Sequence, residues 1–254
     1  MKPLRERHDD QPGFVLHSYP YRETSAIVET FSASYGRVAL VARGAKRTRS
    51  ELRGVLQAFQ PLSLSWAGTG ELKTLVRAEW RGGLPLVGGS ALLCGFYLNE
   101  LLLKLLPRED PHPRLYGEYE SALMRLANGA EQARVLRQFE LTLLAELGYA
   151  LPLTHEVDTG RPVDPAERYY YAFERGPRAV AAEPGRRYPQ VRGATLLALA
   201  SDDYRAPESA AEAKRLMREV LDYYLEQRTI VSRRVVRDLQ AIEDAEGGEN
   251  SAHD

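Results

Sequence analysis

The sequence predicts an α+β protein of two domains, in which a small antiparallel β-barrel precedes a mainly helical domain. Residues 13–83 contain short β-branched segments separated by turn residues, whereas from residue 84 onward the apolar residues recur at helical spacing. The chain has 254 residues, of which 44% are hydrophobic and 27% charged, so it has enough apolar material for a folded core.

The barrel prediction rests on five segments with the alternation of strands. They are Phe14–Leu16, Ala26–Phe31, Arg37–Ala42, Leu62–Trp66 and Leu72–Trp80. Five short strands with no strong helix between them are typical of a small closed barrel, and the OB-fold is the commonest five-stranded form. We therefore expect an OB-fold domain at 13–83, preceded by a flexible N-terminus at 1–12.

The second domain is expected at 84–242. Ala91–Leu106 is apolar almost all round, as in a buried central helix, and Pro107 ends it. A loop-rich insertion at 149–193 contains a short hairpin through 169–173, and the acidic tail at 243–254 is expected to be disordered. The other predicted helices are 114–127, 131–147, 194–201, 208–227 and 232–242.

The cysteine content and the hydropathy of the sequence indicate the cellular compartment. Cys94 is the single cysteine, which excludes an intramolecular disulfide and favours a reducing compartment. The N-terminus has no apolar core of a signal peptide, and the longest uncharged stretch, at 82–99, holds a proline and five glycines. We expect a soluble cytoplasmic protein with no membrane association.

The sequence contains no recognisable catalytic site. The five histidines are scattered, no G-x-S-x-G motif is present, and Gly68–Thr74 lacks the G-K-[ST] ending of a phosphate-binding loop. We expect no catalytic residue, no metal and no cofactor. The acidic pairs at 109–110 and 202–203 are more typical of helix flanks than of a magnesium site. A nuclease on an OB scaffold remains an alternative, as does a general RNA- or single-strand-binding scaffold protein.

The most informative local feature is basic. Residues 1–83 carry 13 Lys and Arg against 8 Asp and Glu, and residues 43–53 read RGAKRTRSELR directly after a predicted strand. Cations on such a loop can neutralise successive phosphates, and released counterions then supply affinity. Tyr19, Tyr21 and Tyr35, at nearby strand ends, could stack on bases. A second basic series at 214–237 is interleaved with glutamates, and we interpret it as a salt-bridged helix surface.

Several separated motifs resemble one known family. Phe14–Leu16, Tyr21–Ser25, Tyr35–Arg37 and Gly44–Ala45 with its basic continuation occur in order within 13–59. The likeness continues through 70–74, 97–101, 137–141 and 147–149, and is looser in the C-terminal third. Together these pieces resemble the RecO family of bacterial recombination mediators, and more closely its zinc-free members, because no cysteine lies between 149 and 190.

The resemblance implies a function without covalent chemistry. Members of this family bind single- and double-stranded DNA, anneal complementary strands, and help to load the recombinase RecA onto DNA coated by single-strand-binding protein. They act with the partner RecR in DNA repair, and their interaction with RecA is indirect. This role in DNA repair implies a nucleoid-associated location. Our candidate DNA contacts are Arg37, Arg43, Lys46, Arg47, Arg49 and Arg53, with Lys73 and Arg77 on a neighbouring strand.

The resemblance also implies contact with the C-terminal tail of single-strand-binding protein, which is acidic and ends in an aromatic residue. Such a peptide needs an apolar pocket beside a cation. The helix at 131–147 offers both kinds of side chain. The candidates for this site are Arg134, Leu136, Arg137, Phe139 and Leu143. Glu23 and Asn99 also match the family pattern, and we interpret both as structural.

Overall fold

The computed structural model describes residues 6–179, 188–204, 206–225, 230–233 and 235. These residues form two compact units. One contains the described residues of Met1–Pro113 and of Thr229–Asp254, and the other those of Arg114–Arg228. The first unit includes the helix that follows the barrel, so the boundary between the units does not coincide with the domain boundary suggested at 83–84.

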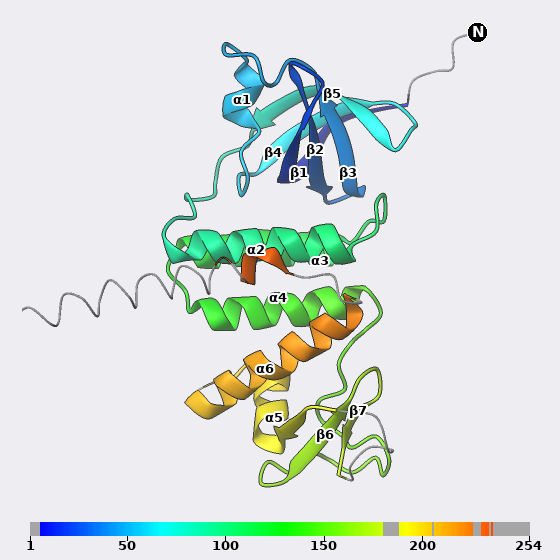
Figure 1. Cartoon of the computed structure of the whole chain (residues 1–254), viewed down its shortest axis with the longest axis vertical. Helices are drawn as coiled ribbons and strands as arrows, with labels where there is room; N and C mark the ends of the chain where they lie inside the picture. The colour runs from blue at the N-terminus through cyan, green and yellow to red at the C-terminus, as the bar shows by residue number, and fades with distance from the viewer. Residues whose placement is uncertain (1–5, 180–187, 205, 226–229, 234, 236–254) are drawn as a thin grey trace, which may run out of the picture. The chain divides into compact units, whose positions relative to one another are not determined.

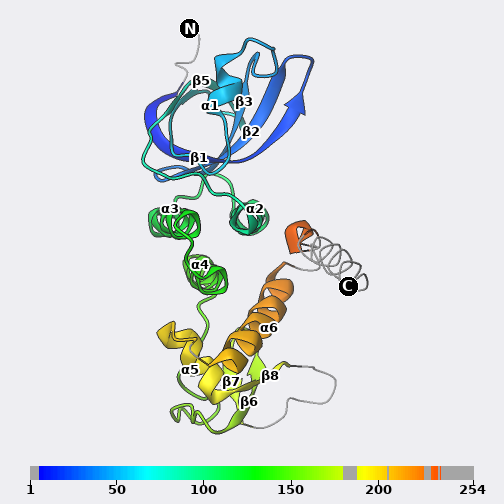
Figure 2. The ribbon, with the colours of Figure 1, turned by 90° about the vertical axis from the view of Figure 1, so that its left-hand side faces the viewer.

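Five strands close into a barrel in the order β1-β2-β3-β5-β4, which Figure 1 shows from the side and Figure 2 from another direction. Neighbouring strands are antiparallel except β3 and β5, which are parallel. This is the strand order of an OB-fold, so the predicted barrel is confirmed. Its elements are β1 (Arg7–Tyr21), β2 (Ser25–Ser32), β3 (Gly36–Ala42), the short helix α1 (Glu51–Val55), β4 (Leu62–Ala67) and β5 (Leu72–Trp80).

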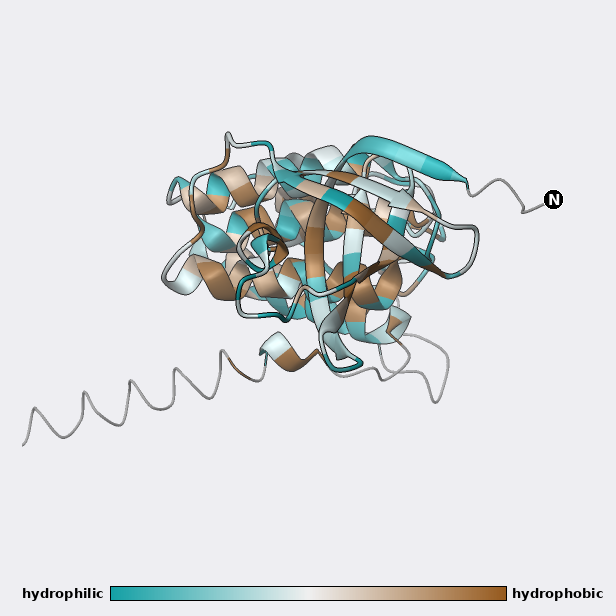
Figure 3. Ribbon diagram, turned by 90° about the horizontal axis from the view of Figure 1, so that it is seen from above, coloured by the Kyte–Doolittle hydropathy of each residue, from teal (hydrophilic) through white to brown (hydrophobic). Residues whose placement is uncertain are grey.

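β1 is longer than the sequence pattern suggests. It begins at Arg7, where the chain pairs with Ala67 of β4, although the segment before Gly13 was expected to be flexible. These first residues are hydrophilic, and Figure 3 shows them in teal near the N label. They have no apolar alternation that would identify a strand, and their backbone groups join them to β4. Gly13 pairs with both Ser32 and Leu62, so β1 closes the barrel. Residues 1–5 lie outside the described residues.

The barrel core follows from the two-residue period of the strands. Leu62, Leu64 and Trp66 alternate along β4, so all three point to one face, and each is completely buried. Val28 of β2 and Leu40 of β3 belong to the same cluster. Burying each such side chain contributes roughly 1.5–3 kcal/mol, which makes this cluster the main source of barrel stability.

The helix α2 (Ser90–Leu105) packs against β1 within the first unit. Its Gly95 lies against the ring of Phe59, because an added Cβ there would be 2.9 Å from Cε1 of Phe59. Near its middle, Glu100 accepts hydrogen bonds from the backbone N–H groups of Val231 (2.7 Å) and Ser232 (2.8 Å). These bonds satisfy backbone donors at the start of the helical residues 231–233. Most of the helix predicted at 232–242, and the whole tail at 243–254, lie outside the described residues.

The second unit combines helices with a small sheet. Tyr119 of α3 and Phe139 of α4 meet edge to face in its core, with ring centroids 6.2 Å apart. α6 contacts both α4 and α5, and a three-stranded sheet in the order β7-β6-β8 lies beside α5 and α6. The predicted hairpin at 169–173 corresponds to β6 and β7, whereas β8 was not predicted. The elements are α3 (Pro113–Ala127), α4 (Gln132–Glu146), β6 (Arg168–Ala172), β7 (Gly176–Arg178), β8 (Gln190–Arg192), α5 (Gly193–Ser201) and α6 (Pro207–Tyr224).

Candidate nucleic-acid interface

The basic segment 43–50 forms an ordered loop between β3 and α1. Ala45 anchors it in the barrel core, being only 8% exposed, and Gly44 adopts a positive φ of 70°. The Lys46 N–H donates to the carbonyl oxygen of Thr24 at 2.9 Å, which ties this loop to the β1–β2 turn. The loop backbone is therefore held from two sides while its charged side chains remain outside.

Five cations project from this loop and from α1 into solvent. None of the five makes an ion pair with any residue that the structure describes, so their charge is available for an anionic ligand. Exposed, flexible Lys and Arg side chains of this kind are what a phosphate backbone requires. The five residues, hereafter the cationic loop, are Arg43, Lys46, Arg47, Arg49 and Arg53.

A pocket of about 490 Å³ opens beside the cationic loop. It lies where the end of β1, the start of β2, the end of β3 and the start of β5 meet. Three arginines contribute to its lining, together with one tyrosine and three Ser or Thr residues, and the lining contains no acidic residue. The lining residues are Tyr21, Arg22, Thr24, Ser25, Val41, Arg43, Gly44, Arg47 and Thr74.

Two of the predicted DNA contacts are engaged inside the first unit. Arg37 is largely buried, with its Nε 3.7 Å from Oε2 of Glu29 and a guanidinium N–H donating to the carbonyl oxygen of Leu103. Burial lowers the pKa of Arg37, although Glu29 acts in the opposite direction. Lys73 is 7% exposed and pairs with Glu109. Arg37 holds the end of α2, and Lys73 the segment after it, against the barrel, and neither side chain faces solvent as the cationic loop does.

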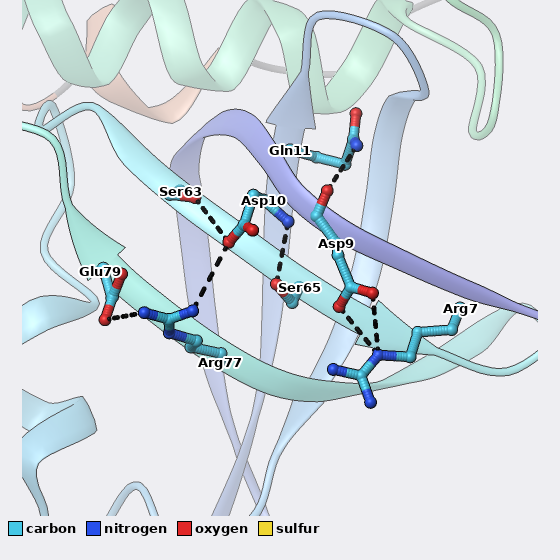
Figure 4. Close-up of polar contacts among 8 residues, drawn as sticks. All are labelled: Arg7, Asp9, Asp10, Gln11, Ser63, Ser65, Arg77 and Glu79. Carbon is cyan, nitrogen blue, oxygen red and sulfur yellow. Dashed lines mark hydrogen bonds and ion pairs between the residues drawn. The ribbon is translucent and has the colours of Figure 1, made fainter.

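Arg77 is exposed but already has acidic partners. Figure 4 shows its guanidinium between Glu79, at 2.7 Å, and Asp10, at 3.8 Å. The same view shows the N–H of Asp10 donating to Oγ of Ser65 at 3.0 Å, where the register between β1 and β4 shifts. Two carboxylates face this one guanidinium, so we expect Arg77 to contribute less to polyanion binding than the cationic loop.

The three candidate tyrosines have different surroundings. Tyr19 is 46% exposed and its ring meets that of His17 with centroids 4.4 Å apart. Tyr21 lines the pocket, with the Arg22 guanidinium 5.1 Å from its ring centroid. Tyr35 is packed against Trp66, with centroids 5.3 Å apart, as part of the barrel core. Tyr21 is therefore the tyrosine that lies beside the basic groups.

Arg22 is the main residue that sequence reasoning did not select. It lies within the family-like segment Tyr21–Ser25. The basic residues of the cationic loop are close together along the chain, whereas Arg22 is separated from them in sequence. Pairing of β2 with β3, which sets Ala26 opposite Ala42, brings the two together. The signal that could have found it is a single basic residue in the β1–β2 turn, because that turn lies beside the loop that follows β3.

The five residues expected to bind an acidic peptide lie on α4 with contrasting exposure. Arg134 is exposed and pairs with Asp202 at 2.7 Å. Arg137 is 8% exposed, pairs with the fully buried Glu140, and donates to the carbonyl oxygen of Lys214 at 3.5 Å. Leu136 is half-buried, whereas Phe139 and Leu143 have no exposed surface. A peptide that docks on this helix without rearrangement would contact Arg134 and Leu136.

The described part of the chain has neither a cluster of metal-ligating side chains nor a membrane-spanning helix. No three His, Cys, Asp or Glu side chains come together there in a group that could hold a metal ion. None of the helices described combines the length and the apolar character needed to cross a bilayer.

Comparison with known proteins identifies the family. Residues 8–83 match the model described as Recombination protein O N terminal, and residues 88–234 match Recombination protein O C terminal. The chain belongs to the RecO family. RecO-family membership places this protein among DNA repair proteins, in agreement with the resemblance seen in its motifs.

Curated relatives named DNA repair protein RecO cover nearly the whole chain. The relative from Aromatoleum aromaticum is 52% identical over 238 residues, which span 94% of this chain and 99% of the relative. That from Dechloromonas aromatica is 50% identical over 243 residues, with 94% and 99% covered. The relative from Ralstonia nicotianae is 51% identical over 236 residues, with 93% and 86% covered.

Proposed function

We propose that this RecO-family protein is a DNA-binding recombination mediator that anneals complementary strands. It would also help to load RecA onto DNA coated by single-strand-binding protein. The observation that carries the proposal is the cationic loop, a set of solvent-facing Lys and Arg side chains without ion pairs to the described residues, on a closed OB barrel. Membership of a DNA repair family supports DNA as the polyanion.

Charge screening explains how such a loop could promote annealing. Two complementary strands repel each other through their phosphates, and the repulsion falls when Lys and Arg side chains replace the counterions of one strand. Contacts to phosphate carry no sequence information and leave the base edges free for pairing. The process needs no bond to be made or broken, so we propose that the protein acts without catalysing covalent chemistry.

Partner proteins belong to the same proposal. RecR is expected to act with this protein, and the tail of single-strand-binding protein is expected to dock on the second unit. Arg134 is the exposed cation of α4 and therefore the better candidate for the tail's terminal carboxylate, in place of the buried Arg137. The location that follows from this role is the cytoplasm, in association with the nucleoid.

The test is reversal of charge on the cationic loop by Lys46→Glu, Arg47→Glu and Arg49→Glu in one variant. Binding to a single-stranded oligonucleotide is measured by fluorescence anisotropy across a range of salt concentrations. Loss of about three phosphate contacts should lower the slope of log K against log salt by roughly 2. Annealing of complementary strands should slow in parallel.

A matched variant controls for net charge. Arg161, Arg168 and Arg175 are exposed on the second unit, and reversing all three changes the charge by the same amount. This control should retain the slope of the unmodified protein. A folded loop variant that keeps its full slope would place the DNA site elsewhere, and cleavage of labelled DNA in the presence of magnesium would favour the nuclease alternative. Stronger binding to RNA than to DNA would favour the general scaffold.

A further inference from the structure

The pocket beside the cationic loop has the chemistry of a nucleotide site. Arg22, Arg43 and Arg47 bring three guanidinium groups to its lining, which suits a phosphate. The Tyr21 ring and the Val41 side chain provide apolar surface, and Thr24, Ser25 and Thr74 provide hydroxyl groups. A nucleoside 5′-phosphate combines the same three features: a charged phosphate, a flat ring, and polar edges.

The size and position of the pocket agree with this ligand class. Its volume of about 490 Å³ falls in the range of roughly 300–1,000 Å³ typical of sites for small organic ligands. The hydrogen bond from the Lys46 N–H to the Thr24 carbonyl oxygen joins the two loops that form its rim. The Arg47 side chain lies over Gly44, where an added Cβ would be 3.6 Å from the Arg47 Cδ, and both residues line the pocket.

We propose that this pocket takes one unpaired nucleotide of a DNA single strand. Its phosphate would lie between Arg43 and Arg47, and its base and sugar would lie against Tyr21 and Val41. The inference rests on the proposed function, in which the cationic loop binds the same strand. It adds a discriminating element, because the cationic loop alone attracts any phosphate backbone.

The pocket would give the protein a preference for single strands. A base in a duplex must be unpaired and unstacked before it can enter a pocket, at a cost of a few kcal/mol, whereas an unpaired base enters directly. Base stacking on an aromatic ring tolerates any base, so the preference does not depend on sequence. A mediator with this site would hold single strands selectively and lose that hold where the strand has paired.

The first test compares Tyr21→Ala with Tyr21→Phe, using a labelled 20-nucleotide oligothymidine and a duplex of equal length. Tyr21→Ala should weaken binding of the single strand by about tenfold, the effect of one lost stacking contact, and leave duplex binding unchanged. Tyr21→Phe keeps the ring and should remain within about twofold of the unmodified protein. Replacing the oligonucleotide by one with abasic sites throughout should abolish the difference between the unmodified protein and Tyr21→Ala.

A matched control and a variant that fills the pocket distinguish binding in the pocket from binding to the surrounding surface. Tyr19→Ala removes an exposed ring from the same strand outside the pocket lining and should change single-strand binding by less than about twofold. Ser25→Trp fills the pocket but keeps every cation, so it should weaken single-strand binding by about tenfold and retain the salt slope. Equal losses for Tyr19→Ala and Tyr21→Ala would overturn the pocket in favour of a flat stacking surface.

A competition experiment distinguishes a strand from a free nucleotide. Thymidine 5′-monophosphate should displace the oligonucleotide only at millimolar concentrations, because a free nucleotide cannot also contact the rest of the cationic loop. Displacement at micromolar concentrations would overturn the assignment to a DNA strand. If Tyr21→Ala and Ser25→Trp both bind single strands normally while reversal of the loop charges lowers the salt slope, the pocket proposal fails and the proposed function stands. If no variant has an effect, both fail.

Discussion

Asn99, in the middle of α2, donates a hydrogen bond from Nδ2 to the backbone carbonyl oxygen of Leu16 on β1, 2.9 Å away. Both residues are buried, at 2% exposure each. The bond joins α2 to a strand of the barrel, and it occurs at a bulge, because the register of β1 with β2 shifts between Val15 and His17. The carbonyl of Leu16 is thus satisfied by a side chain from outside the sheet.

The first prediction concerns this bond. Asn99→Ala should lower the free energy of unfolding by about 1–3 kcal/mol, because the buried carbonyl oxygen of Leu16 loses its donor. Urea unfolding followed by circular dichroism measures the change. Asn128→Ala, at an exposed asparagine after α3, is the control and should shift stability by no more than about 0.5 kcal/mol. Equal stability of the two variants would show that the bond contributes nothing.

The second prediction concerns the arginines of α4. Arg137→Ala should destabilise the protein by about 3–5 kcal/mol, since it removes from the fully buried Glu140 its ion-pair partner. Arg134→Ala, which breaks an exposed pair with Asp202, should cost less than about 1 kcal/mol. Thermal and urea unfolding measure both. The double variant Arg137→Leu, Glu140→Leu should recover much of the loss, and a mild effect of Arg137→Ala alone would contradict the buried pair.

The third prediction concerns pH and Glu100. Burial acts to raise the pKa of this carboxyl, but hydrogen bonds from Lys104 and from the backbone N–H groups of Ser232 and Val231 outweigh it, so the pKa lies below its ordinary value of 4.5. A depressed pKa stabilises the fold at every pH above the ordinary value, and this stability is lost as the pH falls through the folded-state pKa.

The measurement compares the unmodified protein with Glu100→Gln between pH 7 and pH 3. The unmodified protein should be the more stable at pH 7, and the difference should shrink as the pH falls below about 4.3, the usual pKa of an unfolded glutamate. Glu120→Gln, at an exposed position of α3, serves as the control and should show no such trend. A difference that is constant with pH would exclude a charged role for Glu100.

The sequence by itself determined the elements whose signal is local. The alternation of Leu62, Leu64 and Trp66 identifies β4, and the density of basic residues at 43–53 identifies the cationic loop, because both depend on residues adjacent in the chain. Local apolar patterning does not detect the polar start of β1, which pairs with β4 through backbone bonds and polar contacts such as that from the Asp10 N–H to Ser65 Oγ.

Tertiary structure decided which cations are free. Arg37 and Lys73 look like the loop cations in the sequence, yet in the fold Glu29, on the neighbouring strand β2, and Glu109, after α2, neutralise them. Pairing of β2 with β3 likewise brings Arg22 to the pocket that Arg47 also lines. A charge is available to a ligand only when no opposite charge lies within a few ångströms, and these separations depend on how the strands and the segment after α2 pack in the fold.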